Sequence, residues 1–220
     1  MEGKPDLSTE PGGQPRRRLD WTGIVRSLVV PLAVLALIVG GLWYWQSRGS
    51  SSNDAYGTIA LPAEKNPTGE KPAPTKGRAG PDFVLEQPGG GTLRLSDLQG
   101  HPVLLNFWAT WCAPCRAEAP EFVAAYAQYQ SQGLVIVGVD LQEADSNVLS
   151  FAQDFGITYP IAIDRNGEVK NVWRAGGPTN GLPASYFIDS TGVVRDSYPG
   201  QLTPELLQEK LATILPGATG

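Results

Sequence analysis

The chain has 220 residues, of which 41% are hydrophobic, so it can form one domain of ordinary size with additional segments. Charge is divided unevenly: residues 1–80 carry 10 basic and 7 acidic side chains, whereas residues 81–220 carry 7 basic and 15 acidic ones. An acidic second part argues against a nucleic-acid partner and against adhesion to anionic lipid.

Near the N-terminus, residues 27–45 contain no charged side chain. A helix of 19 residues is long enough to cross roughly 30 Å of hydrocarbon. Trp21 lies before this run and the aromatic residues 43–45 lie at its end, where they can anchor the helix at the two membrane interfaces. We therefore predict a transmembrane anchor over residues 21–46.

The flanking charges predict the orientation of this anchor. Residues 16–18 and Arg26 are arginines on the N-terminal side, against Arg48 on the other side. Since basic flanks stay inside, residues 1–20 are expected to form a cytoplasmic tail, and everything after residue 46 is expected to lie outside the cell membrane. A cleaved signal peptide is the alternative, but its apolar core would be unusually long and no small-x-small cleavage site directly follows.

Residues 47–80 are rich in Ser, Gly and Pro and offer few apolar side chains. Such a composition is typical of a flexible linker, and we predict one here, followed by a single domain over residues 81–215. A linker of this kind would hold the domain near membrane-bound partners at a raised effective concentration.

Within the domain, strands and helices alternate. Strands are expected over residues 82–85, 92–95, 103–108, 134–139, 161–163, 185–188 and 193–198. Helices are expected after Cys112 to about residue 130, over 146–155 and from Thr203 to about residue 215, with a short helical turn at 96–98. Ser146 or Asn147 is expected to cap the middle helix and Gly156 to end it, while Pro120 is expected to kink the first one. This pattern predicts an α/β fold.

Cys112 and Cys115 are the two cysteines of the chain, and they lie where the apolar strand 103–108 gives way to a helix. Backbone N–H groups at a helix N-terminus favour thiolate over thiol, so the pair is typical of a redox switch. A zinc site is the first alternative, but two cysteines and the single His101, in a turn, do not supply four ligands. A structural disulfide is the second, although so short a loop constrains the unfolded chain little.

The chain resembles the TlpA/ResA branch of the thioredoxin superfamily. The resemblance covers roughly residues 79–215 and rests on the motifs Pro-Asp-Phe at 81–83, Leu-Ser-Asp-Leu at 95–98, Leu-Asn-Phe-Trp-Ala-Thr-Trp-Cys-Ala-Pro-Cys at 105–115 and Gly-Leu-Pro-Ala-Ser-Tyr-Phe-Ile-Asp at 181–189. It implies a thioredoxin-like fold with an N-terminal β-hairpin and a central helix–strand insertion at 146–163, preceded by one transmembrane helix. It also implies a membrane-anchored thiol–disulfide oxidoreductase of the cell exterior.

Cys112 is expected to attack a substrate disulfide and Cys115 to resolve the mixed disulfide, since Cys112 lies nearer the helix terminus. Glu118 lies one turn after Cys115 and faces the same side. The resemblance implies a buried carboxylate at this position, where it would exchange a proton with Cys115. Plain thioredoxins have an acid on the preceding strand instead, at the position of Asn106.

The resemblance further implies that Pro183 is a cis-proline beside the cysteines, with the Leu182 backbone presented to an extended substrate. Trp111 and Pro114 are expected to contact substrate at the edge of the site. We expect no metal and no cofactor. No cation separates the two cysteines and an acid lies nearby, so a reductant of moderate to low potential is expected.

The resemblance suggests disulfides of exported proteins as substrates, either the haem-attachment cysteines of apocytochrome c or the thiols of copper-delivery proteins. A membrane thiol carrier would supply the electrons. Three other functions remain alternatives. A peroxiredoxin-like peroxidase would need a Thr where Ala109 stands, a Cu(I) chaperone would need a further histidine, and a disulfide oxidase or isomerase would differ in redox potential alone.

Overall fold

The computed structural model describes residues 32, 35–40, 56–176 and 181–215. The chain divides into two units, residues 1–52 and residues 53–220. In the first unit, residues 32 and 35–40 are helical. The expected tail 1–20 lies outside the described residues, as does most of the expected anchor 21–46. Among the described residues, no helix has the length and apolar character needed to cross a membrane.

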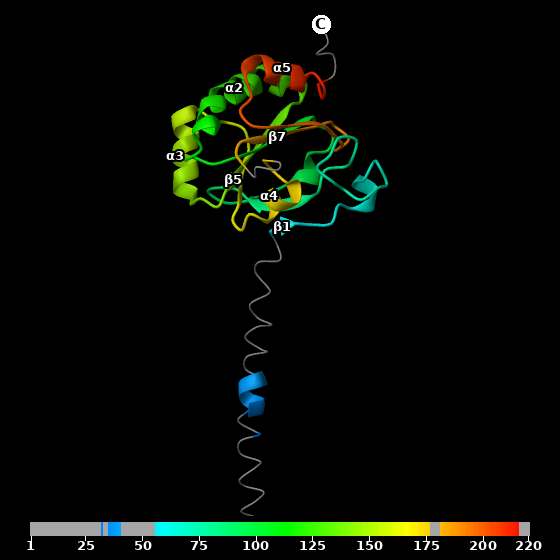
Figure 1. The fold of residues 1–220 in the computed structure, drawn as a ribbon, viewed down its shortest axis with the longest axis vertical. Helices are drawn as coiled ribbons and strands as arrows, with labels where there is room; N and C mark the ends of the chain where they lie inside the picture. The colour runs from blue at the N-terminus through cyan, green and yellow to red at the C-terminus, as the bar shows by residue number, and fades with distance from the viewer. Residues whose placement is uncertain (1–31, 33–34, 41–55, 177–180, 216–220) are drawn as a thin grey trace, which may run out of the picture. The chain divides into compact units, whose positions relative to one another are not determined.

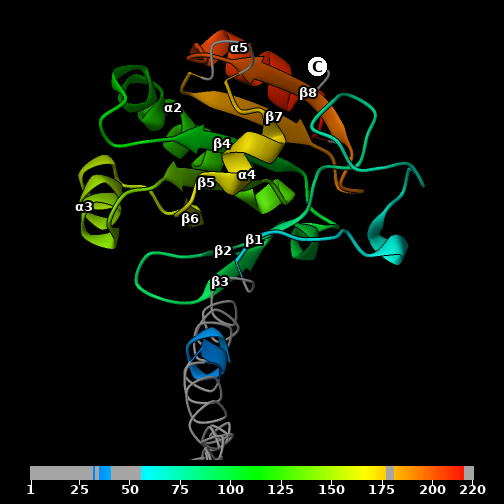
Figure 2. The same cartoon turned by 60° about the horizontal axis from the view of Figure 1, so that its bottom comes forward.

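The second unit is built on one sheet of eight strands in the order β1-β2-β6-β5-β4-β7-β8, with β3 paired to β2 (Figures 1 and 2). The strands are β1 (Gly57–Thr58), β2 (Phe83–Glu86), β3 (Thr92–Arg94), β4 (Val103–Trp108), β5 (Val135–Leu141), β6 (Ile161–Asp164), β7 (Ala184–Ile188) and β8 (Val194–Pro199). The central strands β4, β5 and β6 are parallel, and β7 and β8 run antiparallel beside β4. This confirms the α/β thioredoxin-like fold.

Helices cover both faces of the sheet. They are α2 (Ala113–Tyr129), α3 (Asp145–Phe155), α4 (Glu168–Trp173) and α5 (Pro204–Leu211), with short 3₁₀ helices η1 (Ala63–Lys65), η2 (Leu95–Leu98) and η3 (Gln130–Gln132). Because side chains alternate along β4, Leu104 packs with α2 and α5 and Trp108 with α2 and α3. Phe107 points to the other face, where it packs with α4, β3 and η2. Asn106 therefore faces α2.

Most predicted elements are present to within a few residues, including the hairpin of β2 and β3 and the insertion of α3 and β6. Gly156 ends α3 in a left-handed conformation with φ of 66°, and Thr203 caps α5 by accepting the Leu206 N–H. The expected cap of α3 was wrong: Ala144 occupies the N-cap position without a side-chain hydrogen bond, and Ser146 already lies inside the helix. The helix α5 ends at Leu211 and continues as turns.

The expected linker is wrong for residues 57–80, which form part of the folded domain. β1 pairs antiparallel with β2, and Ala79 is fully buried and bridges Val193. The segment is held by backbone hydrogen bonds, such as Gly80 N–H to the Gly192 carbonyl at 3.0 Å, which need no apolar side chain. At Gly80 itself, a Cβ would come within 2.8 Å of the Trp173 ring, so only glycine fits.

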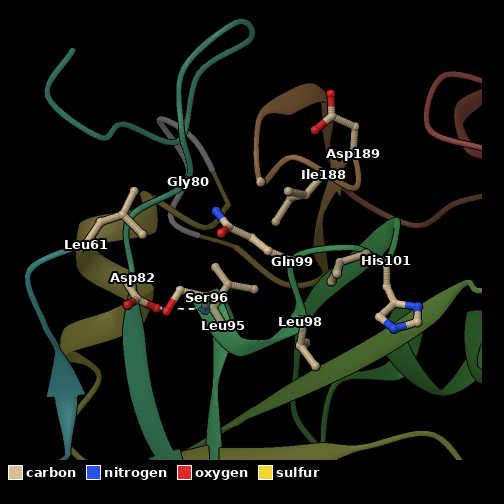
Figure 3. A pocket seen from close by; sticks show the side chains of 12 residues that line it. Leu61, Gly80, Asp82, Leu95, Ser96, Leu98, Gln99, His101, Ile188 and Asp189 are labelled. Carbon is tan, nitrogen blue, oxygen red and sulfur yellow. Dashed lines mark hydrogen bonds between the residues drawn. The ribbon is translucent and has the colours of Figure 1, made fainter. Parts of the chain in front are cut away.

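This segment also lines a small cavity beside the start of β4 (Figure 3). The cysteines follow the last residue of β4, at the other end of the strand. Leu61 and Gly80 line the cavity together with residues of η2 and the β7–β8 turn. At its edge, the buried Asp82 carboxylate pairs with Arg94 and accepts the Ser96 N–H at 2.9 Å. The Pro-Asp-Phe motif therefore serves the fold, since Asp82 joins β2 to η2.

The helix α4 was not predicted. It has six residues, too few for an apolar period, yet it ends in Trp173, which is fully buried. The Trp173 ring lies 4.9 Å from that of Tyr186 and 6.3 Å from that of Phe107, centroid to centroid. The Tyr186 hydroxyl donates to the Trp173 carbonyl. The aromatic cluster thus fixes α4 on the sheet.

We predict that Trp173→Ala lowers the free energy of unfolding by about 3–5 kcal/mol, because it leaves a cavity between α4 and the face of the sheet. Val172→Ala, at the neighbouring half-exposed position, is the matched control and should change it by less than about 1 kcal/mol. Urea denaturation of the full chain measures both. An equal decrease in the free energy of unfolding for the two variants would show that Trp173 does not fix α4 on the sheet.

Candidate active site

The cysteine pair lies at the junction between strand β4 and helix α2. β4 ends at Trp108, and Cys112 takes the N-cap position of α2, with a proline in the first turn. The Cys112 sulfur accepts the Cys115 N–H at 3.3 Å. Cys112 and Cys115 form a disulfide with their Cα atoms 5.2 Å apart. In the reduced protein the same N–H donors would stabilise a Cys112 thiolate.

The surroundings of the disulfide leave little of it exposed. Cys112 is 5% exposed and Cys115 3%, whereas the neighbouring Trp111 is 71% exposed. Leu182 packs against the apolar cluster that contains both cysteines, and the Leu182–Pro183 peptide bond is cis. The structure therefore brings Leu182 to the apolar cluster in which the cysteine pair is buried. The roles of Trp111, Pro114, Leu182 and Pro183 in substrate binding stay predictions.

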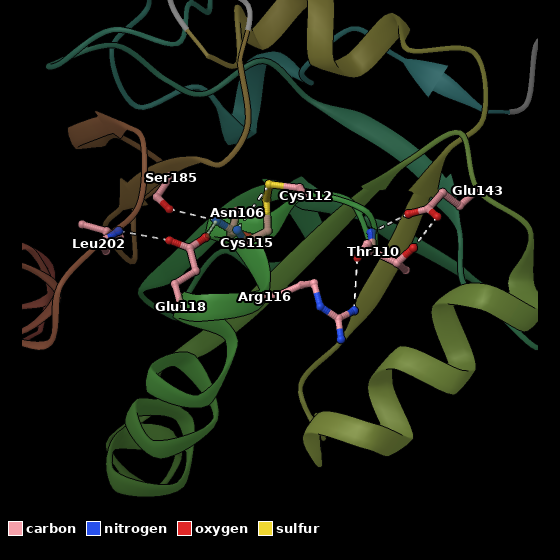
Figure 4. The surroundings of a disulfide bond; sticks show 9 residues. All are labelled: Asn106, Thr110, Cys112, Cys115, Arg116, Glu118, Glu143, Ser185 and Leu202. Atoms are coloured by element: carbon pink, nitrogen blue, oxygen red, sulfur yellow. Dashed lines mark hydrogen bonds between the residues drawn. A yellow bond between two sulfur atoms is a disulfide. The ribbon is translucent and has the colours of Figure 1, made fainter.

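Behind the pair, Glu118 is buried, with 1% of its surface exposed (Figure 4). Its Oε1 accepts the side-chain N–H of Asn106 at 3.1 Å, and its Oε2 accepts the Leu202 backbone N–H at 3.1 Å. Asn106 also donates to the Ser185 hydroxyl at 3.0 Å. A carboxyl group in the core is thus joined to β4 and β7 and to the segment before α5.

Burial raises the pKa of Glu118 to about 7, against the lowering effect of the hydrogen bonds from Leu202 and Asn106. A carboxyl group with this pKa takes up and releases a proton near neutral pH, as exchange with a thiol requires. Sequence analysis named Asn106 only as the replacement of an acid and missed Ser185. Asn106 is a polar residue inside the apolar run of β4, and this feature of the sequence could have pointed to the network.

On the other side of the cysteines lies a second polar group that sequence analysis also missed (Figure 4). Glu143, from the loop between β5 and α3, accepts hydrogen bonds from Thr110, and Arg116 donates to the Thr110 carbonyl at 3.2 Å. Asp140 lies beneath them, fully buried at the end of β5. Nothing in the sequence spacing joins these residues, because the loop between β5 and α3 brings them together.

His101 lies before the first residue of β4, whereas Cys112 follows its last one, so the histidine is at the opposite end of the strand. Its Nδ1 lies 3.2 Å from the Gly133 carbonyl oxygen. Among the described residues, no group of three or more His, Cys, Asp or Glu side chains is arranged to hold a metal ion.

Residues 77–197 match the AhpC/TSA family. A thiol-disulfide oxidoreductase ResA of Geobacillus thermodenitrificans is 42% identical over 147 residues, which cover 67% of this chain and 82% of that protein. The ResA of Bacillus subtilis is 34% identical over 145 residues, covering 66% and 79%. The chain belongs to the ResA family of thiol–disulfide oxidoreductases.

A solved structure from Chlorobium tepidum, described as a thiol:disulfide interchange protein DsbE, agrees with this assignment. It superposes with a TM-score of 0.58 at 31% identity and covers 63% of this chain and 97% of that one. As in its ResA relatives, the activity of this chain is thiol–disulfide exchange with protein disulfides, and it is a protein-disulfide reductase.

We predict that Glu118 makes the stability of the oxidised protein depend on pH. Its pKa is raised from 4.5 to about 7 in the folded state, so the folded protein binds this proton more tightly than the unfolded chain does. The stabilisation is complete below pH 4.5 and is lost as pH rises through 7, by up to about 3 kcal/mol. Denaturation of wild type and Glu118→Gln from pH 4 to pH 8 measures it.

The difference between the two proteins should change across this range and level off above it. Glu121→Gln, three residues later on α2 and only partly buried, is the matched control and should follow wild type. A constant difference between wild type and Glu118→Gln at every pH would show that Glu118 does not titrate in this range.

Proposed function

We propose that this protein reduces disulfides of exported proteins while it is anchored in the cell membrane. The observation that carries the proposal is the buried Glu118 carboxyl group, whose pKa lies near 7, directly behind a cysteine pair with no cation between its members. Such a site favours protonated thiols over a strongly stabilised thiolate, which is typical of reducing members of the superfamily rather than oxidising ones.

In the proposed reaction the Cys112 thiolate attacks one sulfur of a substrate disulfide. The Cys112–substrate bond forms, the substrate disulfide breaks, and one substrate thiolate leaves. Cys115 then passes its proton to the Glu118 carboxylate and attacks the Cys112 sulfur, which releases the second substrate thiolate. Two electrons pass to the substrate, and the protein is left with the Cys112–Cys115 disulfide that the structure contains.

The substrates we propose are the haem-attachment cysteines of apocytochrome c or the thiols of copper-delivery proteins. The apolar residues 27–45 with arginines before them support an anchor with the N-terminus in the cytoplasm. The exposed Trp111 supports docking of an extended segment beside Leu182 and Pro183. A membrane thiol carrier would then reduce the disulfide again.

Two alternatives lose support from the geometry. A peroxidase of the related peroxiredoxin type would use a hydroxyl three residues before the reactive cysteine, where this chain has the buried Ala109. A Cu(I) chaperone would need a third soft or imidazole ligand, and His101 lies at the other end of β4. A disulfide oxidase or isomerase shares the chemistry, so the redox potential distinguishes it.

We predict a reduction potential for the Cys112–Cys115 pair near or below about −270 mV, the value of thioredoxin. The full chain is equilibrated with dithiothreitol or glutathione buffers, and the reduced fraction is measured by thiol labelling. Cys115→Ser, which cannot form the disulfide, is the control for labelling. A potential near about −120 mV would overturn the proposal and identify an oxidant that installs disulfides.

We also predict that Cys115→Ala traps a mixed disulfide between Cys112 and an oxidised peptide that carries the haem-attachment sequence Cys-x-x-Cys-His. Without the resolving thiol the intermediate cannot proceed. Cys112→Ala is the control and should trap far less. Equal trapping of this peptide and of an unrelated disulfide peptide, measured by non-reducing electrophoresis and mass spectrometry, would argue against apocytochrome c as the preferred substrate.

A further inference from the structure

The backbone that leads into Cys112 is held by one carboxylate from another part of the chain. Glu143 Oε2 accepts the Thr110 backbone N–H at 2.6 Å, and Oε1 accepts the Thr110 hydroxyl at 2.6 Å (Figure 4). Both oxygens of the carboxylate are therefore used on a single residue, two positions before the attacking sulfur. Hydrogen bonds to an ionised acceptor are the strong ones in proteins.

Thr110 is held from a second side as well. Its carbonyl accepts a hydrogen bond from Arg116 on α2 at 3.2 Å. The Arg116 guanidinium in turn lies over the rings of Phe151 and Phe155 on α3, at 5.3 and 5.2 Å from their centroids. The N–H, hydroxyl and carbonyl of Thr110 are thus all bound by side chains outside its own loop.

Glu143 has its own support in Asp140. The Asp140 carboxyl group is fully buried, and its Oδ1 accepts the Glu143 backbone N–H at 3.2 Å. Asp140 is paired in register with Trp108 and Ile163, which belong to the apolar cluster of the two cysteines. Within the described part of the chain, its Oδ2 has no hydrogen-bond partner.

Burial, and then the side chain and charge of Glu143, raise the pKa of Asp140 to about 8, against the lowering effect of the hydrogen bond from the Glu143 backbone N–H. Near neutral pH, Asp140 therefore keeps its proton beside the Glu143 carboxylate. Charged groups near this pair include Arg116, from α2, and Arg165, which donates to the Glu143 carbonyl at 3.1 Å and also pairs with Asp145 on α3.

We propose that Glu143 is a positioning residue for thiol–disulfide exchange: it fixes Thr110, and thereby the Cys112 sulfur at the N-terminus of α2, while the buried Asp140 carboxyl group holds Glu143 by accepting its backbone N–H. Attack requires the thiolate to stay within reach of the N–H groups that stabilise it, and a loose loop would remove it from them. The inference rests on the exchange activity of the family and is independent of the substrate proposed above.

The first test is a double-mutant cycle on the full chain. Glu143→Gln keeps the size of the side chain but removes its charge and one of its two acceptor oxygens. We expect the rate constant for exchange with a small neutral disulfide to fall roughly tenfold, since hydrogen bonds to charged groups are lost. Glu205→Gln, exposed on α5, is the matched control and should react like wild type.

Thr110→Val removes only the hydroxyl donor to Glu143 and should lower the rate by a smaller factor. Added to Glu143→Gln, it should cause little further loss, because both changes break one contact. Unfolding is measured for every variant, and Thr110→Ser should restore the rate where Thr110→Val lowers it. The proposal would be overturned if folded Glu143→Gln exchanged at the wild-type rate. It would also be overturned if the double variant lost rate by the full product of the two single-variant factors.

The second test follows the Thr110 amide proton by NMR while the pH is raised. In wild type its chemical shift should change near pH 8, as Asp140 ionises and repels Glu143. Asp140→Asn should remove this change, and Glu118→Gln should keep it. Persistence of the change in Asp140→Asn would exclude Asp140 as its source. If wild type exchanges with small disulfides but Cys115→Ala traps no haem-attachment peptide, the substrate proposal alone is defeated.

Discussion

The active site depends on the burial of one carboxyl group. Glu118 on α2 is buried and accepts two hydrogen bonds, one from the side chain of Asn106 on β4 and one from the Leu202 backbone before α5. These contacts tie the helix that carries the cysteines to the centre of the sheet. Desolvation outweighs them, so the group keeps a proton to about pH 7. The same burial therefore both orients α2 and gives Glu118 the pKa that the proposed proton transfer requires.

Two acidic residues lie on opposite sides of the cysteine pair, Glu118 on one side and Glu143 on the other (Figure 4). Glu118 is buried within the protein and suited to proton transfer. Glu143 is bound at both oxygens by Thr110, so its charge is used to hold the backbone. Proton transfer and positioning are thus assigned to separate residues.

Sequence analysis succeeded where one local rule decides the structure. The continuous apolar run of β4 and the cysteine spacing placed the redox pair at a helix N-terminus, and Thr203 with Pro204 fixed the start of α5. It failed where distant parts of the chain meet. The segment 57–80 is held by backbone pairing, and α4 is held by one tryptophan. The contact of Glu143 with Thr110 joins residues 33 positions apart through the loop between β5 and α3. Composition and periodicity do not predict such contacts.

The geometry of the disulfide also restricts how electrons enter and leave. Cys112 is nearly covered, and the strongly exposed side chain beside it is Trp111. A substrate and an electron donor each need an in-line approach to the Cys112 sulfur, since Cys115 lies deeper, against Ala119 and the core. If substrates dock at Trp111 and Leu182 as we propose, both use this one surface and cannot occupy it together. Reduction of the substrate and renewal of the dithiol therefore alternate, and the free oxidised protein is an obligatory intermediate between them.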